Sequence, residues 1–222
     1  MKDAAVPKPR YRAATKEDLY EVGRVYLRAF PESPRSFASP QLTPLAVGDV
    51  MRAALEADPG SIIVAQAPAG EIVGYVIAVA EVANLLHVAL FRGLVLRWLW
   101  RWVRGLYRLS LTGALLLARD KLRLRRARPA PGTEDCAARI VSLAVDPDWR
   151  RCGVGTQLLF AGLQRLRALG RSFVRLEVRP DNLTARHLYQ TAGFREVGQF
   201  DDTRGSWIVM MAGMGAQEEP PP

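Results

Sequence analysis

A glycine pair between a strand pattern and a helix pattern constrains this 222-residue chain more than any other feature. A β-branched run ends at Val145, Pro147 begins a turn, and Gly153-Val-Gly155 leads into an amphipathic helical pattern. Glycine permits positive φ angles and close approach to a ligand, and amides at a helix start point beside the positive end of the helix dipole. The window predicts either an anion cradle, to which the neighbouring Arg150 would add charge, or a tight turn that merely precedes a helix.

The rest of the chain alternates between strand and helix patterns, which predicts the α/β class. Seven segments of strand-like length are rich in apolar or β-branched residues, which predicts strands at residues 11–14, 62–65, 72–80, 139–145, 172–178, 194–200 and 206–212. Four segments repeat apolar residues at helical spacing, which predicts helices at residues 16–29, 50–57, 154–169 and 183–192. We expect Thr15 to cap the first helix with Asp18 as its acidic partner, Pro68–Gly70 to form a hairpin turn, and residues 31–44 to form a loop.

A second motif follows the glycine pair. It reads Asn182-x-x-Ala185-x-x-Leu188-Tyr189-x-x-x-Gly193-Phe194, and it comes after Arg150-x-x-Gly153-x-Gly155. In this order and at this separation, the two motifs resemble the GNAT superfamily of N-acetyltransferases. The strings LAVDP and LEVRPDN are most similar to the branch that acetylates the N-terminal alanine of a ribosomal protein. The resemblance implies a mixed central sheet flanked by helices; it covers residues 139–212 well, residues 11–80 loosely and residues 85–128 not at all.

The resemblance also implies an acyl-CoA site, with acetyl-CoA as co-substrate and no metal. Backbone groups of residues 143–145 would hold the pantetheine arm, amides of residues 151–156 would hold the pyrophosphate, and Tyr189 would lie near the sulfur. The cofactor-binding residues implied in this way are Leu143, Ala144, Val145, Arg150, Arg151, Cys152, Gly153, Val154, Gly155, Thr156, Asn182 and Tyr189.

Acyl transfer to an amine requires a group that accepts the proton of the amine, donors for the oxyanion, and an acid for the departing thiolate. Tyr189 is the expected acid, and a purely structural core tyrosine is the alternative. Glu177 lies between Leu176 and Val178 on a predicted strand, where burial would make a carboxylate a better base near neutrality. In the resembled branch, a glutamate twelve positions before the tyrosine has this role. Deprotonation through water chains, or an exposed strand glutamate without a catalytic role, are the alternatives.

The remaining nucleophiles and ligands are sparse. Two cysteines, Cys136 and Cys152, and two histidines, His87 and His187, form no metal-ligand spacing, and we expect none of them to be catalytic. The N-terminal residues have no apolar core of a secretory signal. We therefore expect a reducing, cytoplasmic location.

The positive charge of the chain is concentrated in one segment. Residues 85–128 hold eleven Lys and Arg against one acid, Asp120, so this segment has a net charge of +10. The whole chain has a net charge of +9, so the other 178 residues together carry −1. Four of these arginines, at positions 97, 101, 104 and 108, share one side of a helix at about 100° per residue, and Trp and Leu residues fill the remaining arc. The apolar runs are too short to span a bilayer as a helix, which takes about 20 residues.

We expect residues 82–128 to form a basic amphipathic helical insertion in an acyltransferase domain of residues 1–212, followed by a disordered tail at 213–222. The insertion is expected to lie on an anionic membrane surface at the inner face of the membrane, or to pack on the domain or a second copy; nucleic acid is the weakest alternative. The predicted reaction is direct attack of a primary amine, on a small molecule or a peptide N-terminus, on acetyl-CoA. The alternatives are a longer-chain acyl donor with a membrane-associated amine, and a CoA-binding docking module without turnover.

Overall fold

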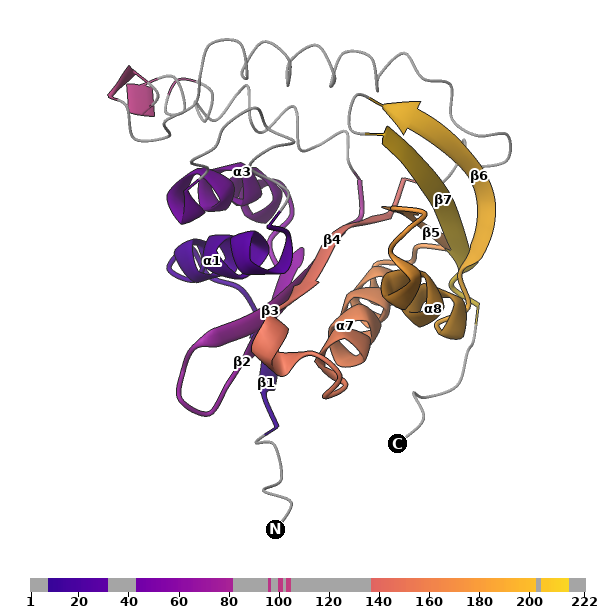
Figure 1. Cartoon of the computed structure of the whole chain (residues 1–222), viewed down its shortest axis with the longest axis horizontal. Helices are drawn as coiled ribbons and strands as arrows, with labels where there is room; N and C mark the ends of the chain where they lie inside the picture. The colour runs from indigo at the N-terminus through magenta and orange to yellow at the C-terminus, as the bar shows by residue number, and fades with distance from the viewer. Residues whose placement is uncertain are drawn as a thin grey trace.

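Seven strands form one mixed sheet in the computed structural model, which describes residues 8–31, 43–81, 96, 100, 101, 103, 104, 137–202 and 205–215 (Figure 1). The strands are β1 (Arg10–Ala13), β2 (Ile62–Gln66), β3 (Ile72–Val79), β4 (Arg139–Val145), β5 (Phe173–Val178), β6 (Arg195–Asp202) and β7 (Gly205–Gly213). The helices are α1 (Leu19–Ala29), α3 (Pro44–Ala57), a short 3₁₀ turn η1 (Pro147–Trp149), α7 (Val154–Ala168) and α8 (Leu183–Thr191).

The sheet order is β1-β2-β3-β4-β5-β7-β6, and β4–β5 is its single parallel pair. Helix α7 connects these two strands, as a parallel crossover requires. Strands β4 and β5 pair only at Arg139–Arg175 and Ile140–Leu176, although both strands are described in full. Beyond these two pairs the strands part, so an opening forms near the middle of the sheet.

Helices cover both faces of the sheet (Figure 1). Helices α1 and α3 pack through Val22, Val25 and Met51 on one face, together with Tyr75 of β3. Helices α7 and α8 pack on the other face, in a cluster whose members include Leu158, Leu166, Val174, Leu176 and Tyr189. Strand β3 is buried along its whole length because both layers cover it. The predicted α/β class and the mixed, helix-flanked sheet are confirmed.

Two predicted helix starts were wrong. Helix α1 begins at Leu19 instead of residue 16, so its N-cap residue is Asp18 and not Thr15 as predicted; the Asp18 carboxylate accepts from the Thr15 amide at 2.7 Å. Helix α3 begins at Pro44 instead of residue 50, and the hydroxyl of Thr43 caps it by accepting from the Ala46 amide at 3.2 Å. Pro44 at the first helical position is compatible with a helix, because its missing amide has no partner there, and Gly48 lies inside α3.

Most of the predicted insertion lies outside the described residues; within it, Leu96, Trp100, Arg101 and Val103 are helical. Of the predicted tail, residues 213–215 are described, and Gly213 ends strand β7. Among the helices that the structure describes, none has the length and apolar character needed to cross a membrane.

Candidate functional site

The turn before α7 has the backbone geometry of an anion cradle. Arg151 and Gly153 both adopt left-handed conformations, with φ of 63° and 76°. Gly153 caps α7, and the first amide to bond back within the helix is that of Gln157, which donates to the Gly153 carbonyl at 3.1 Å. The amides of Val154, Gly155 and Thr156 therefore point out of the helix start, where an anion can accept from them.

Gly155 lies between β4 and α8. A Cβ atom at this position would lie 3.6 Å from Val145 Cγ2 and 3.8 Å from Leu188 Cδ2, which are ordinary contacts. A Cβ atom at Gly153 would meet no atom within 4 Å, so it is the positive φ there, and not packing, that favours glycine. The predicted cradle residues thus come together at the end of β4.

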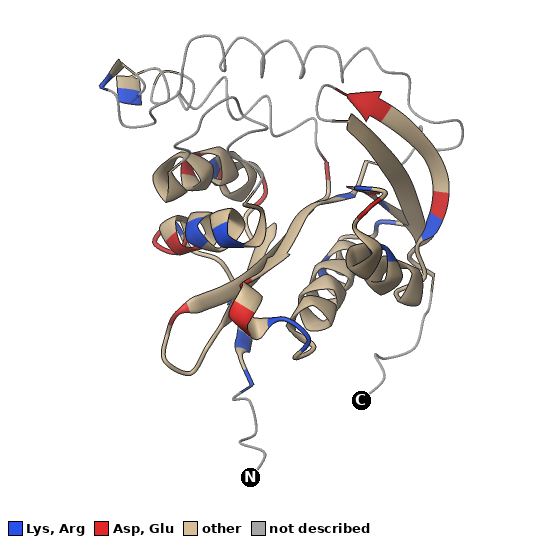
Figure 2. Ribbon diagram, viewed as in Figure 1, with Lys and Arg blue, Asp and Glu red and all other residues tan. Residues whose placement is uncertain are grey.

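Two arginines tie this turn to helix α1. Arg150 donates from Nε to the Val145 carbonyl at 3.3 Å and from Nη2 to the Ala29 carbonyl at 3.2 Å. Arg28 pairs with the buried Asp146 at 2.7 Å and with the exposed Asp148 at 2.9 Å. Acidic and basic residues accordingly gather around η1 and the turn that follows it (Figure 2). The sequence analysis missed Arg28 and Asp146; the Asp-Pro start of η1 is a local signal for the aspartate, and none exists for Arg28.

A β-bulge accompanies the separation of β4 from β5. Ser142 pairs with Ile77 and Ile140 with Ala78, which leaves Val141 as an extra residue in β4. A bulge bends its strand and increases the local twist. The Tyr75 hydroxyl lies 2.9 Å from Ser142 Oγ beside this bulge, and burial raises the pKa of Tyr75. The three predicted backbone positions, 143–145, follow at the parted end of β4.

Tyr189 lies on the α7 side of the sheet. It belongs to the apolar cluster that also contains Val154 and Val178, and its ring centroid is 5.8 Å from that of Phe194. Only 8% of the residue is exposed, and this burial raises the pKa of Tyr189 to about 12. The phenol therefore keeps its proton at neutral pH, so it can donate a hydrogen bond and cannot act as a base through its ionised form.

Glu177 lies on the opposite face, because Val174, Leu176 and Val178 of β5 face α7. Its Oε1 atom accepts from Arg175 Nε at 3.0 Å and lies 3.5 Å from Arg139 Nη1. The Glu177 side chain is 18% exposed. The carboxylate thus has two cationic neighbours, which the strand pattern did not predict.

Asn182 has a structural contact that the motif alone did not indicate. Its Oδ1 atom accepts from the Ala185 amide at 3.1 Å and caps α8. Cys152 is exposed in the turn, with its Sγ 3.4 Å from the Arg150 carbonyl, and His187 is exposed on α8. His87 and Cys136 lie outside the described residues. Within the described part of the chain, no three His, Cys, Asp or Glu side chains are grouped as metal ligands would be.

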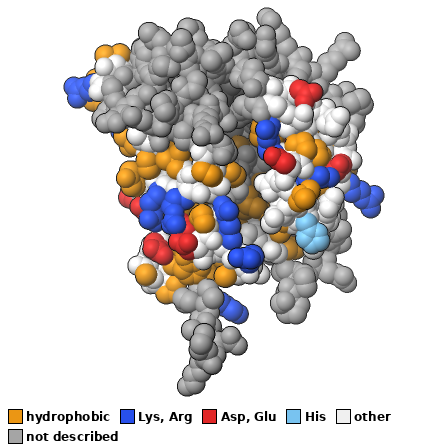
Figure 3. Space-filling view, viewed as in Figure 1, with side chains coloured by type: hydrophobic (Ala, Val, Ile, Leu, Met, Phe, Trp, Pro, Cys, Tyr) orange, Lys and Arg blue, Asp and Glu red, His pale blue; other side chains and the backbone are white. Residues whose placement is uncertain are grey.

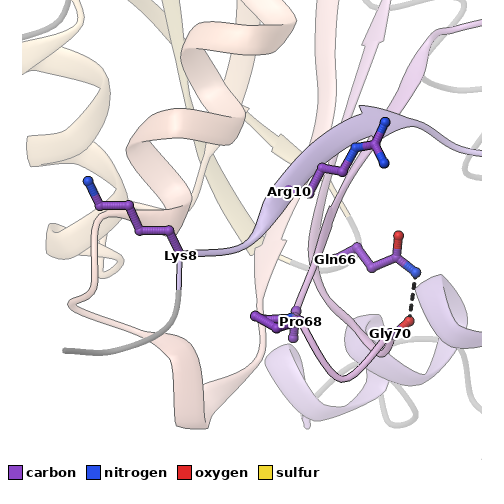
Figure 4. A pocket seen from close by; sticks show the side chains of 6 residues that line it. Lys8, Arg10, Gln66, Pro68 and Gly70 are labelled. Atoms are coloured by element: carbon purple, nitrogen blue, oxygen red, sulfur yellow. Dashed lines mark hydrogen bonds between the residues drawn. The ribbon is translucent and has the colours of Figure 1, made fainter. Parts of the chain in front are cut away.

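A hollow of about 410 Å³ lies elsewhere, at the β1 end of the sheet (Figure 4). Its lining residues are Lys8, Arg10, Gln66, Ala67, Pro68 and Gly70. Gln66 donates to the Gly70 carbonyl at 2.8 Å and so supports the β2–β3 turn. None of the predicted site residues lines this hollow.

A sequence model of the Acetyltransferase (GNAT) family matches residues 24–194, which is most of the chain and includes both motifs. The chain belongs to the GNAT acetyltransferase family. The predicted superfamily is thereby confirmed.

Curated relatives agree with this assignment. The GNAT chain is 42% identical over 82 residues to a mycothiol acetyltransferase of Clavibacter michiganensis subsp. michiganensis, covering 37% of the chain and 27% of the relative. It is 41% identical over 59 residues to the ribosomal protein bS18-alanine N-acetyltransferase of Escherichia coli (strain K12), covering 27% of the chain and 40% of the relative. Both matches span less than half of the relative's length. The predicted likeness to the alanine branch is confirmed, and the likeness to mycothiol acetyltransferases is new.

Among solved structures, the GNAT chain is similar to the crystal structure of SsHAT. The TM-score is 0.70 at 21% identity, over 95% of this chain and 100% of that chain. At this level of identity the similarity concerns the fold, and it supports the sheet arrangement described above.

Proposed function

We propose that this protein transfers an acetyl group from acetyl-CoA to a primary amine by direct attack. The observation that carries the proposal is the opening between β4 and β5, at which the end of β4 meets the glycine turn and the start of α7. Membership in a family of acetyltransferases supports the same reaction.

The residues at this opening fit a coenzyme A thioester. Amides of residues 151–156 are suited to the pyrophosphate, because two left-handed residues and a helix start aim them at one region. Backbone groups of Leu143, Ala144 and Val145 lie where β4 no longer pairs with β5, so they are suited to the pantetheine arm. Arg150 holds the glycine turn in place through its hydrogen bonds to the Ala29 and Val145 carbonyls, and Asn182 caps α8. When bound, the thioester supplies the electrophilic carbonyl.

Tyr189 is proposed as the acid for the departing thiolate. The raised pKa of about 12 keeps its hydroxyl protonated at neutral pH. A thiol in water has a pKa of about 8.5, well below that of Tyr189, so the phenol stabilises the departing thiolate by donating a hydrogen bond to the sulfur, and full transfer of the proton is uphill. The nearness of α8 to the first turn of α7 supports this role, since a Cβ atom built at Gly155 would lie 3.8 Å from Leu188 Cδ2.

Glu177 is proposed as the group that accepts the proton of the amine, directly or through water. Its position on the sheet face opposite Tyr189 supports this role, since the proton acceptor for the amine and the donor for the sulfur then lie on different faces. Arg175 and Arg139 fix the carboxylate in place at 3.0 and 3.5 Å. We expect Glu177 to accelerate the reaction without being indispensable, because water can also carry the proton of the amine.

The acceptor is proposed to be a primary amine on a peptide N-terminus or a small molecule. Likeness to a ribosomal protein bS18-alanine N-acetyltransferase and to mycothiol acetyltransferases supports both acceptor kinds. A panel with an N-terminal alanine peptide and small primary amines, each tested with acetyl-CoA and with longer acyl-CoAs, will identify the acceptor and the chain length together.

The test of the proposed function is a thiol-release assay on Gly153→Ala with Gly170→Ala as matched control. Both glycines flank α7, both have positive φ (76° and 71°), and an added Cβ meets nothing within 4 Å at either. Each substitution should therefore cost about 1 kcal/mol of stability. Only Gly153 lies in the cradle, so we expect its variant alone to raise the KM for acetyl-CoA, by about 10-fold or more.

Equal KM values for the two variants would contradict the cradle. A wild-type protein that releases no thiol with any acceptor, although calorimetry detects acetyl-CoA binding, would favour the docking module without turnover.

A further inference from the structure

The insertion meets the acetyltransferase domain through an ion pair on α3. Arg101 pairs with Asp49, whose side chain is almost fully buried, while the Arg101 side chain is 22% exposed. Separating a buried carboxylate from its cationic partner strongly destabilises the folded protein, so we expect the Arg101–Asp49 ion pair to stay formed. The contact therefore fixes which side of the helical residues near Arg101 faces the domain.

The other side of these residues is apolar and exposed. Leu96, Trp100 and Val103 are 71%, 54% and 74% exposed. At about 100° per residue, they lie roughly 100° to 160° around the helix from Arg101, on the side away from α3. Arg104 stacks over Trp100, with its guanidinium carbon 4.0 Å from the ring centroid. We call Leu96, Trp100, Val103 and Arg104 the docking face; in Figure 3, side chains of this segment lie at the upper left edge of the molecule.

Charge decides which partner fits the docking face. The surrounding segment, residues 85–128, holds eleven Lys and Arg and one acid, so a matching partner is anionic. A second copy of this chain would bring the same positive charge to the contact and repel it. Nucleic acid is anionic, but it offers no apolar environment for Leu96 and Val103. An anionic bilayer offers phosphate groups for arginine and an acyl boundary for Trp and Leu.

We propose that the docking face binds the surface of an anionic lipid bilayer, with the Arg101–Asp49 ion pair holding it outward. Trp100 and Leu96 enter the acyl boundary, and Arg104 remains with the lipid phosphates. Binding needs no acetyl transfer, so its test is independent of the proposed function.

The test is vesicle flotation of the full chain. The vesicles contain phosphatidylcholine alone or phosphatidylcholine mixed with phosphatidylglycerol. We expect wild type to float with the mixed vesicles only, and added salt to weaken the binding. A triple variant, Leu96→Gln with Trp100→Gln and Val103→Gln, should have an affinity for the mixed vesicles that is lower by about 10-fold or more. Leu169→Gln, at a residue that is 48% exposed beyond the end of α7, is the matched control and should bind as wild type does.

Three outcomes would overturn the proposal. The first is wild-type protein that does not float with mixed vesicles, and the second is a triple variant that floats as well as wild type. The third is a wild-type protein that is a dimer in light scattering without lipid while the triple variant is a monomer, which would assign the docking face to a second copy. Since all three positions are exposed, the triple variant should retain the wild-type melting temperature, which separates loss of binding from loss of folding.

Discussion

Tyr189 and Glu177 lie on opposite faces of the sheet, and opposite kinds of neighbour surround them. Tyr189 is buried among apolar side chains beside Phe194, where burial raises its pKa to about 12. Glu177 has two arginines within 3.5 Å. Burial disfavours the charged form of the phenol, whereas the two guanidinium groups hold the Glu177 carboxylate in place. On one face the phenol keeps a hydrogen that it can donate, and on the other face two ion pairs fix the position of a carboxylate.

The largest expected effect comes from the buried face. Tyr189→Phe removes the hydroxyl and leaves the apolar packing, so we expect kcat to fall by about 100-fold to 1,000-fold with little change in stability. Thiol release under saturating acetyl-CoA measures it. Tyr11→Phe is the matched control, because burial also raises the pKa of Tyr11, which is half-buried on β1 and outside the site. A Tyr189→Phe enzyme with the wild-type kcat would make Tyr189 a core residue only.

A substitution at Glu177, on the ion-paired face, should lower activity less than the substitution at Tyr189. Glu177→Gln keeps the shape of the side chain and removes its charge, and we expect kcat/KM to fall by about 10-fold, because water can still carry the proton. Glu56→Gln is the control: Glu56 is also a partly buried acid paired with an arginine, Arg52, but it lies on α3. A Glu177 variant as active as the Glu56 variant would leave Glu177 only a structural ion pair.

The contrast between these faces also shows what sequence could predict. Alternation along β5 predicted that Glu177 faces away from Leu176, because this pattern follows from local geometry. A core position for Tyr189 was only the alternative to its expected role as an acid. The same alternation puts Arg175, two positions earlier, on the face of Glu177, but the second arginine, Arg139, could not be predicted. Arg139 reaches it only because β4 and β5 pair at Arg139–Arg175, a contact between strands separated by a whole crossover.

The same distinction explains the start of α3. Gly23 and Gly48 allow α1 and α3 to approach closely, since a Cβ atom at Gly48 would lie 2.5 Å from the Leu19 carbonyl oxygen and one at Gly23 would lie 2.2 Å from that of Pro44. The close approach of α1 therefore requires glycine at position 48 of α3, whereas glycine in the local sequence disfavours a helix. The cradle was predictable, because turn, glycines and helix start are adjacent in sequence. Its fastening through Arg28 and Asp146 was not, because those residues are far apart in the chain.

A smaller effect concerns pH and again separates the two faces. A tyrosine with a pKa of 10 unfolded and about 12 folded gives stability that is complete below pH 10 and is lost as pH rises toward 12. At pH 11 the loss is about 1 kcal/mol, from the change of 1.36 kcal/mol per pKa unit. Urea unfolding should therefore show that the free energy of unfolding falls less between pH 8 and pH 11 for Tyr189→Phe than for wild type. An equal loss would mean that Tyr189 is not shielded from water in solution.

The smallest expected effect tests how α8, which carries Tyr189, is held in place. Asn182→Ala removes the cap at the Ala185 amide and should lower the free energy of unfolding by about 1 kcal/mol, measured by urea unfolding. Asn182→Asp keeps a capping oxygen and adds a charge that suits a helix start, so its stability should match or exceed that of wild type. If the side chain serves only as a cap, the aspartate variant also keeps the wild-type KM for acetyl-CoA. A stable aspartate variant with a raised KM would instead mean that the Asn182 side chain touches the cofactor, because the new carboxylate would then repel its phosphates.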